Sequence, residues 1–199
     1  MSDGVIGVNA VQPLRDKKDI DKMKSYLKEK NPRDYLMFMI GISSALRISD
    51  ILKLKVSDVW DGKKVKSHID IRETKTDKGK RFAISPNLEK AIREFIKSNK
   101  LSPDDYLITS NKPDRDGKTR PISRQQAHDI LSNAADWIGI KDAVSTHTMR
   151  KTWGYWAYKN GVSLALIMEA LNHSSIANTK KYLGITQDDL DEVYISLNL

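Results

Sequence analysis

A histidine and an arginine three residues apart form the clearest chemical pattern in the chain. His147 and Arg150, in the segment THTMR, are spaced so that both side chains lie on one face of a helix, near its start. A helix N-terminus favours anions, and an arginine adds a bidentate clamp for phosphate. The pair therefore predicts a phosphate-binding site. A surface histidine beside a salt-bridging arginine would give the same pattern, so this motif alone leaves both interpretations open.

A second unusual cation is Arg47, which falls in a turn between two apolar segments. Asp50 follows one helical turn later, and we expect it to hold the guanidinium. Because a buried arginine needs such a carboxylate in any case, an ordinary ion pair in the core fits as well as a functional role. Neither motif decides the function without the elements that position it.

Most of the chain has the apolar period and the caps of α-helices. Helices are expected from Asp16 to Lys30, from Pro32 through Ile42, after a Ser49 cap through Leu54, from Pro86 through Ile96, from Ser123 to Ile138, from Thr146 to Asn160, from Ser163 to Leu171, and over residues 176–183 and 187–196. Residues 1–14 are expected to form a flexible lead-in.

One segment has a different period. Apolar and polar residues alternate in residues 63–85 around the polar stretch TKTDKGK, which predicts a β-hairpin. Asp61–Gly62 is a turn signal before it. The predicted fold class is therefore mainly α with a small antiparallel β-sheet (α+β).

The charge of the chain is unevenly distributed. The formal net charge is +8 over 199 residues, but residues 1–182 carry +12 and residues 183–199 carry −4. A basic body attracts polyanions, because each neutralised phosphate releases counterions. Nucleic acid is the leading partner, although many lysine-rich domains are basic for solubility alone.

Several classes of protein are excluded by composition. The chain has no cysteine, so disulfide scaffolds, zinc fingers and thiol nucleophiles are excluded. The longest apolar run, near residues 36–45, is too short to span a bilayer, and no secretory signal is visible. We therefore expect a soluble, cytoplasmic protein, with no membrane and no small-molecule substrate.

Three separate segments together resemble the active-site boxes of the tyrosine recombinases, the phage integrase family. They are GISSALRISDILKL, THTMRKT, and LNHSS followed by NTKKYLGI. The resemblance extends over residues 12–186 and implies the catalytic-domain fold of DNA breaking-rejoining enzymes. It also implies six catalytic residues, namely Arg47, Lys75, His147, Arg150, His173 and Tyr182, with Asp50 in support.

The resemblance implies a role for each of these residues. Tyr182 would attack a DNA phosphate and form a 3′-phosphotyrosyl link, which requires neither ATP nor a metal cofactor. His147 would take the tyrosine proton, and Lys75 would protonate the leaving 5′ oxygen. The remaining cations would stabilise the charge on the phosphate oxygens; these are Arg47, Arg150 and His173.

Some assignments within the resemblance have rivals. Lys78 and Lys80 are alternatives to Lys75 in the hairpin, and Tyr194 is a weaker rival to Tyr182 because it lies in the acidic tail. Tyr155 and Tyr158 lie on an aromatic-rich helix, where core packing is expected. Further DNA contacts are expected from the basic residues near the boxes, which are Lys78, Lys80, Lys151, Lys180 and Lys181.

The chain also departs from the family pattern. Asn172 stands where the third box commonly has glycine, and we expect the turn to survive because asparagine tolerates the left-handed conformation. The usual N-terminal core-binding domain is not visible, as in a catalytic fragment or the short fimbrial-switch subgroup. Residues 15–186 are expected to form the catalytic domain. Residues 187–199 form an acidic tail, with an apolar stripe expected to pack on a neighbouring protomer of a tetramer.

The sequence therefore predicts a site-specific DNA recombinase, integrase-like and bacterial or phage-encoded. A relaxing enzyme similar to type IB topoisomerases would use the same residues. A non-catalytic DNA-binding accessory protein of the same fold is the alternative from another class, although such a module has no need of Tyr182. Neither the DNA target nor the direction of recombination follows from the residues.

Overall fold

The computed structural model describes residues 11–74, 77–185, 191 and 194–197. The chain divides into two compact units, residues 1–153 and 154–199, and each is described by itself. The boundary falls inside helix α7 (Thr146–Lys159). The predicted fold class is confirmed, because the described chain is mainly helical with one small antiparallel sheet.

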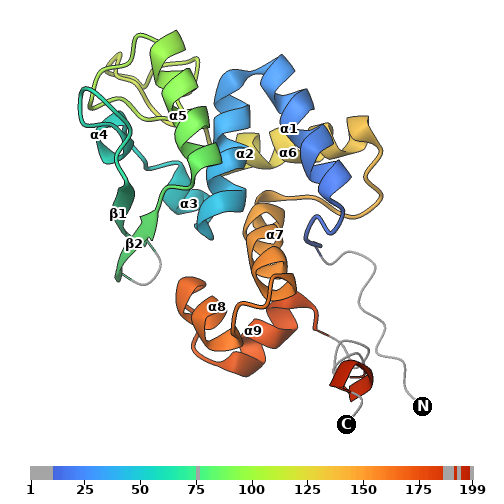
Figure 1. The fold of residues 1–199 in the computed structure, drawn as a ribbon. Helices are drawn as coiled ribbons and strands as arrows, with labels where there is room; N and C mark the ends of the chain where they lie inside the picture. Colours follow the sequence, from blue (N-terminus) through green and yellow to red (C-terminus); the bar gives the residue numbers. More distant parts are fainter. Residues whose placement is uncertain (1–10, 75–76, 186–190, 192–193, 198–199) are drawn as a thin grey trace. The chain divides into compact units, whose positions relative to one another are not determined.

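The first unit is built around the apolar helix α2 (Pro32–Ser44). Helices α1 (Lys17–Lys30) and α5 (Pro86–Ser98) pack against α2, and α6 (Arg124–Ile138) packs against α1 (Figure 1). Leu36, Met37 and Ile40 of α2 are fully buried. Two short helices, α3 (Ile48–Ile51) and α4 (Val56–Val59), lead from this bundle to the sheet.

Four of the predicted helix starts are confirmed by their caps, which satisfy backbone N–H groups that the helix itself cannot. The side chains of Asp16, Asn31, Ser85 and Ser123 each accept a hydrogen bond from the first turn of the helix that follows. Gly139 ends α6 with a φ of 81°, as predicted for a left-handed C-cap.

Two predicted caps are wrong by one or two residues. The short helix α3 begins at Ile48 with Arg47 at the N-cap position, so Ser49 lies inside it. Thr146 is the first residue of α7, and the Oγ of Ser145 accepts the hydrogen bond from the backbone N of His147 at 3.2 Å. Adjacent hydroxyl residues compete for one cap, and tertiary contacts decide which of them is used.

The predicted hairpin is confirmed, with shorter strands than residues 63–85 would allow. Strand β1 (His68–Arg72) pairs antiparallel with β2 (Gly79–Ala83), and Ile69 lies opposite Phe82 (Figure 1). The turn at Asp61–Gly62 is closed by a bridge between Trp60 and Val65. Gly62 has a φ of 99°, which explains why a glycine is needed there.

The second unit contains the end of α7, helix α8 (Leu164–Ala170) and helix α9 (Ile176–Leu183). Ile167, Leu171 and Leu183 are its buried apolar residues. A Cβ on Gly154 would come within 2.7 Å of Leu183, so this glycine permits the close approach of α7 to α9. Ser163 and Ser175 cap α8 and α9, which confirms both predicted helices.

The turn after α8 survives without glycine, as predicted. Asn172 has a φ of 48°, and its backbone N donates to the carbonyl of Glu169 at 2.8 Å. Of the helix predicted over residues 187–196, only residue 191 and residues 194–197 are described, and they are helical. Thr186, Leu190 and Val193 lie outside the described residues. Tyr194 and Leu197 are exposed.

None of the helices in the described part of the chain is long and apolar enough to cross a membrane.

Helices α2 and α7 meet at Gly41, inside the first unit. A Cβ on Gly41 would lie 2.3 Å from the Sδ of Met149 and 2.8 Å from its Cβ. We predict that Gly41→Ala lowers the free energy of unfolding by about 1 to 3 kcal/mol, since this packed interface has no room for a methyl group. Denaturant unfolding measures the effect.

Gly79→Ala is the matched control, because a Cβ there would meet nothing within 4 Å. A change within about 0.5 kcal/mol is expected for it. Equal effects of the two substitutions would contradict the close approach of α2 and α7.

Candidate active site

A cavity of about 360 Å³ in the first unit is lined by three of the predicted basic residues. Arg47, His147 and Arg150, which are distant in sequence, all line it. The complete lining is Leu46, Arg47, Ile48, Ser49, Thr74, Arg124, Thr146, His147 and Arg150. None of these residues is acidic. The starts of α3, α6 and α7 therefore bring four basic side chains to one hollow.

Arg47 is held by a different carboxylate from the one predicted. Its Nη1 lies 2.8 Å from Oε2 of Glu73, whose side chain is 1% exposed. Asp50 instead accepts a hydrogen bond from the backbone N of Thr74 at 2.9 Å. The prediction of an Arg47–Asp50 pair is wrong because Asp50 is used to tie the end of β1 to α3. Both carboxylates connect the hairpin to the α3 corner.

Arg150 is buried, with 4% of its surface exposed. Its Nη1 donates to the carbonyl oxygen of Ala45. Ala45 ends α2 in the left-handed conformation, with a φ of 54°. The C-terminal end of a helix carries partial negative charge, so the end of α2 stabilises the buried guanidinium.

His147 lines this cavity with an exposed side chain and lies near several cations. Burial lowers the pKa of its imidazole below 6.5, and the charges of Arg150, Lys151 and Arg47 lower it further. The ring is therefore mainly neutral at pH 7. A neutral imidazole can accept a proton, whereas an imidazolium cannot.

The three hairpin lysines have different surroundings. Lys75 lies outside the described residues. Lys78 is exposed near the turn, while Lys80 on β2 is half-buried and its Nζ donates to the carbonyl oxygen of Ser44 at 3.4 Å. Burial lowers the pKa of Lys80 to about 8, with a further contribution from the charge of Arg150. Lys80 and Arg150 thus contact adjacent carbonyls at the end of α2.

The second unit brings His173 and Tyr182 together. Their rings lie edge to face with centroids 4.9 Å apart. Nδ1 of His173 is 3.2 Å from Oγ1 of Thr179, and that oxygen donates to the carbonyl of Ser175 at 3.1 Å. Thr179 and Tyr182, three residues apart on α9, therefore share the face that contacts the histidine.

The other predicted residues are less enclosed. Lys151 on α7 is half-buried, and burial together with Arg15 lowers its pKa. Lys180 and Lys181 on α9 are exposed. The rings of Tyr155 and Trp156 pack edge to face, with centroids 5.6 Å apart. Both side chains are only half-buried, as is Tyr158, so the predicted packing of the two tyrosines in the core is confirmed only in part.

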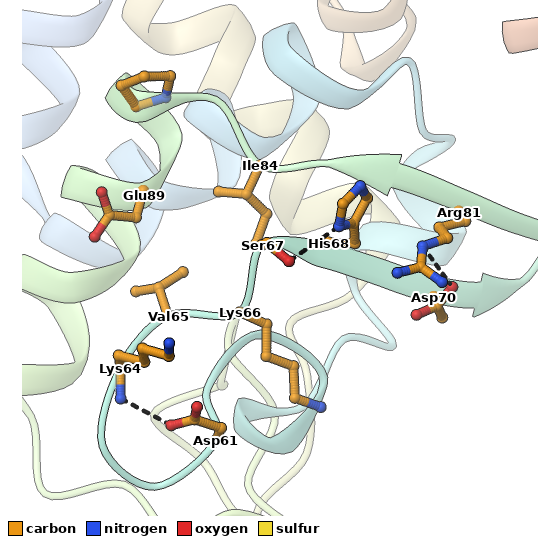
Figure 2. Close-up of a pocket in the computed structure, with 11 residues that line it drawn as sticks. Asp61, Lys64, Val65, Lys66, Ser67, His68, Asp70, Arg81, Ile84 and Glu89 are labelled. Carbon is orange, nitrogen blue, oxygen red and sulfur yellow. Dashed lines mark hydrogen bonds and ion pairs between the residues drawn. The ribbon is translucent and has the colours of Figure 1, made fainter.

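A larger cavity of about 560 Å³ lies beside the hairpin and contains none of the predicted catalytic residues (Figure 2). Its lining contains as many carboxylates as lysines and arginines. Asp61 caps the backbone N–H groups of Lys63 and Lys64, which lowers its pKa. Arg81 lies 3.8 Å from Asp70. Because these charges are balanced, volume alone does not identify the functional cavity.

No group of three or more histidine, aspartate or glutamate side chains in the described residues is placed to hold a metal ion.

The fold and the order of these residues along the chain are compatible with one class of protein. The model of the phage integrase family matches residues 15–188, so the chain belongs to the phage integrase family, as its sequence motifs predicted. It is 41% identical over 187 residues to the probable integrase/recombinase YoeC of Bacillus subtilis (strain 168), with 94% of this chain and 97% of that protein covered.

Longer relatives match over part of their length. The chain is 28% identical to the tyrosine recombinase XerA of Thermococcus onnurineus (strain NA1), with 87% of this chain and 58% of that protein covered. It is 26% identical to a tyrosine recombinase of Pseudothermotoga lettingae, with 80% and 52% covered. The chain thus spans little more than half the length of these two relatives.

Solved structures share the fold. The crystal structure of XerA recombinase superposes with a TM-score of 0.75 at 21% identity, covering 96% of this chain and 67% of that one. XerH site-specific recombinase bound to palindromic difH substrate gives 0.70 at 18% identity, covering 93% and 53%. The predicted tyrosine recombinase catalytic-domain fold is confirmed.

Three residues near these groups were not predicted from the sequence. Glu73 gives no local signal, because its contact with Arg47 spans 26 positions. Arg124 directly follows the Ser123 cap, which could have placed it at a helix N-terminus. Thr179 lies three residues before Tyr182, a helical spacing that could have suggested a shared face.

The lowered pKa of Lys80 predicts a pH-dependent effect on stability. Below about pH 8 the amine is charged in both states, and its burial destabilises the fold; between about pH 8 and 10.5 only the unfolded chain carries the charge. We therefore expect Lys80→Met to raise the free energy of unfolding at pH 7 by about 1 to 2 kcal/mol. This advantage should shrink as the pH rises from 8 to 10.5.

Chemical denaturation of both chains over pH 7–10.5 measures this difference, since every other titrating group is shared. Lys78→Met, an exposed change in the same hairpin, should leave stability unchanged. A methionine variant that is less stable at pH 7, or an advantage that stays constant with pH, would show that Lys80 is not destabilised by its surroundings.

Proposed function

We propose that this protein is a site-specific DNA recombinase that cleaves and rejoins double-stranded DNA through a 3′-phosphotyrosyl intermediate. The observation that carries the proposal is the cavity in which Arg47, His147 and Arg150 converge with no acidic residue in its lining. Such a hollow suits the doubly charged transition state of a phosphodiester. Family membership supports the proposal, as do relatives solved with DNA, such as lambda integrase bound to a COC′ core site.

The proposed reaction conserves the energy of the bond that it breaks. The phenolic oxygen of Tyr182 attacks the scissile phosphorus, a P–O bond to tyrosine forms, and the bond from phosphorus to the 5′ oxygen breaks. His147 takes the phenolic proton, for which its neutral form is suited. The 5′ hydroxyl of another strand then attacks the phosphotyrosine and restores Tyr182. No step consumes ATP.

The cations have complementary proposed roles. Arg47, Arg150 and His173 stabilise the non-bridging oxygens, and Lys75 protonates the departing 5′ oxygen. Arg124, which lines the same cavity, adds a further positive charge. These charges supply the electrostatic stabilisation that metal ions give in other phosphoryl transfers. Contacts to neighbouring phosphates come from Lys78, Lys80, Lys151, Lys180 and Lys181.

Assembly on DNA is the part of the proposal that rests on the resemblance alone. We propose a homotetramer in which residues 187–199 pack on a neighbouring protomer. The exposure of Tyr194 and Leu197 is compatible with such a contact, because exposed apolar side chains on an acidic segment gain from burial against a partner.

The covalent intermediate gives the decisive test. Incubation with a library of duplexes that carry a nicked strand and a randomised sequence should trap a covalent protein–DNA adduct, because the short cleaved product diffuses away and rejoining stops. Sequencing the DNA that stays attached in detergent gives the preferred site. Tyr182→Phe should form no adduct, since the attacking hydroxyl is missing.

Tyr194→Phe is the matched control and should form the adduct at the native level. Peptide mass spectrometry of the native adduct should find the nucleotide on Tyr182. An adduct that persists in Tyr182→Phe, or the absence of any adduct with the native chain, would refute the proposed reaction and favour a DNA-binding accessory protein.

The lowered pKa of His147 predicts the acid side of the pH profile. Because the neutral ring accepts the proton, single-turnover cleavage of the selected duplex should decline at acid pH, with the midpoint of this decline below pH 6.5. His147→Gln keeps a polar side chain of similar size but cannot accept the proton. It should cleave about 100-fold more slowly and lose this acid limb. An unchanged profile in His147→Gln would assign the proton to another group.

A further inference from the structure

The second unit contains a contact that the proposed reaction does not use. Nδ1 of His173 lies 3.2 Å from Oγ1 of Thr179, which is fully buried. Histidine can carry its proton on either ring nitrogen, and the hydrogen bond made by one nitrogen sets the role of the other. The partner of Nδ1 therefore bears on what the imidazole can do at Nε2.

The hydroxyl proton of Thr179 already has an acceptor. Oγ1 lies 3.1 Å from the carbonyl oxygen of Ser175, four residues earlier on α9, which is a common contact for threonine in helices. A carbonyl oxygen can only accept. If the hydroxyl instead donated to Nδ1, two oxygen atoms would face each other lone pair to lone pair at this distance.

Both contacts are satisfied at once in only one arrangement. Oγ1 donates to the Ser175 carbonyl, and its lone pair accepts a hydrogen bond from Nδ1–H of His173. In the neutral ring, Nε2 then bears the lone pair, and Nε2 must take up a proton before His173 can donate to a phosphate oxygen, as the proposed function requires. We propose that Thr179 is a positioning residue, which fixes the tautomer and the ring orientation of His173 through this hydrogen bond.

Hydrogen bonds hold the backbone on both sides of His173, so the orientation of its ring depends on side-chain contacts. The backbone N of His173 donates to the Met168 carbonyl at 3.0 Å. On the other side, the backbone N of Asn178 donates to Oγ of Ser175 at 3.1 Å, and its Nδ2 donates to Oγ of Ser174 at 3.2 Å. Rotation of the ring about its Cβ–Cγ bond, which exchanges the positions of Nδ1 and Cδ2, is the motion that Thr179 opposes.

The same helix face connects this contact to Tyr182. The imidazole stands edge to face against the tyrosine ring, with an interplanar angle of 78°. Thr179 and Tyr182 are one turn apart on α9, so a single helix positions the histidine and carries the proposed nucleophile. The effect of Thr179 on cleavage rests on the proposed function, whereas its effect on the tautomer does not.

Nitrogen-15 spectra of the histidine rings in the full chain, without DNA, test the tautomer directly. The chain has four histidines, and His173→Gln identifies the signals of His173. The neutral ring of the native protein should carry its proton on Nδ1. A native ring protonated on Nε2 would overturn the proposal, whether or not any variant folds.

Two substitutions separate the hydroxyl from the shape of the side chain. Thr179→Val removes the acceptor at similar volume and should give a mixture of tautomers; unchanged His173 signals would overturn the proposal. Thr179→Ser keeps the hydroxyl and should keep the native spectrum; a valine-like spectrum would also overturn it. Thr152→Val removes a buried hydroxyl of the first unit, which accepts from the backbone N of Leu14 at 2.9 Å, and should leave the His173 signals unchanged.

Cleavage of the selected nicked duplex tests the consequence. Thr179→Val should slow single-turnover cleavage about 10-fold to 100-fold, as is typical when the group that orients a functional histidine is lost. Thr179→Ser should stay within about threefold of the native rate. If the native chain forms no adduct, the proposed function fails while the spectra still decide the tautomer. Native-level cleavage by Thr179→Val would overturn the positioning role alone.

Discussion

The accumulation of like charges at one corner of the first unit is the constraint on which the rest of the structure depends. Arg47, Arg150 and Lys80 are all held near the end of α2, and each repels the others in a partly dry environment. The fold offsets this with a buried carboxylate, Glu73, and with the carbonyl oxygens at the C-terminal end of the helix. Removing a cation relieves the repulsion, whereas removing Glu73 would leave a positive charge without its ion pair.

The surrounding elements are arranged to bring these groups to the same corner. Gly41 lets α7 approach α2 closely enough for Arg150 to reach the Ala45 carbonyl. Asp50 ties the end of β1 to α3 through Thr74, and this places Glu73 against Arg47. The helix bundle and the hairpin are therefore coupled through the site itself, and neither could shift without separating a cation from its acceptor.

Local signals predicted the elements, and the family resemblance named Arg47, His147 and Arg150, which line one cavity, but neither predicted the contacts of these residues. Caps such as Asn31 and Ser123 and a left-handed Asn172 follow from short-range chemistry, so they could be predicted from the sequence. The partner of Arg47 could not, because Asp50 and Glu73 are both plausible carboxylates and only the packing of the hairpin on α3 selects between them. Thr179 was missed for the same reason, since its contact with His173 requires the turn between α8 and α9.

Burial and charge crowding also shift the pKa values at this corner of the first unit. An isolated lysine is charged at neutral pH, whereas an isolated histidine changes its charge near pH 6.5. The burial and neighbouring cations that destabilise the charged forms lower the pKa of Lys80 to about 8 and that of His147 below its usual value. The burial and the repulsion that weaken the fold are therefore also the causes of both lowered pKa values. A variant that removes one of these cations should gain stability and also relax the pKa shifts of its neighbours, because the same electrostatic interactions produce both effects.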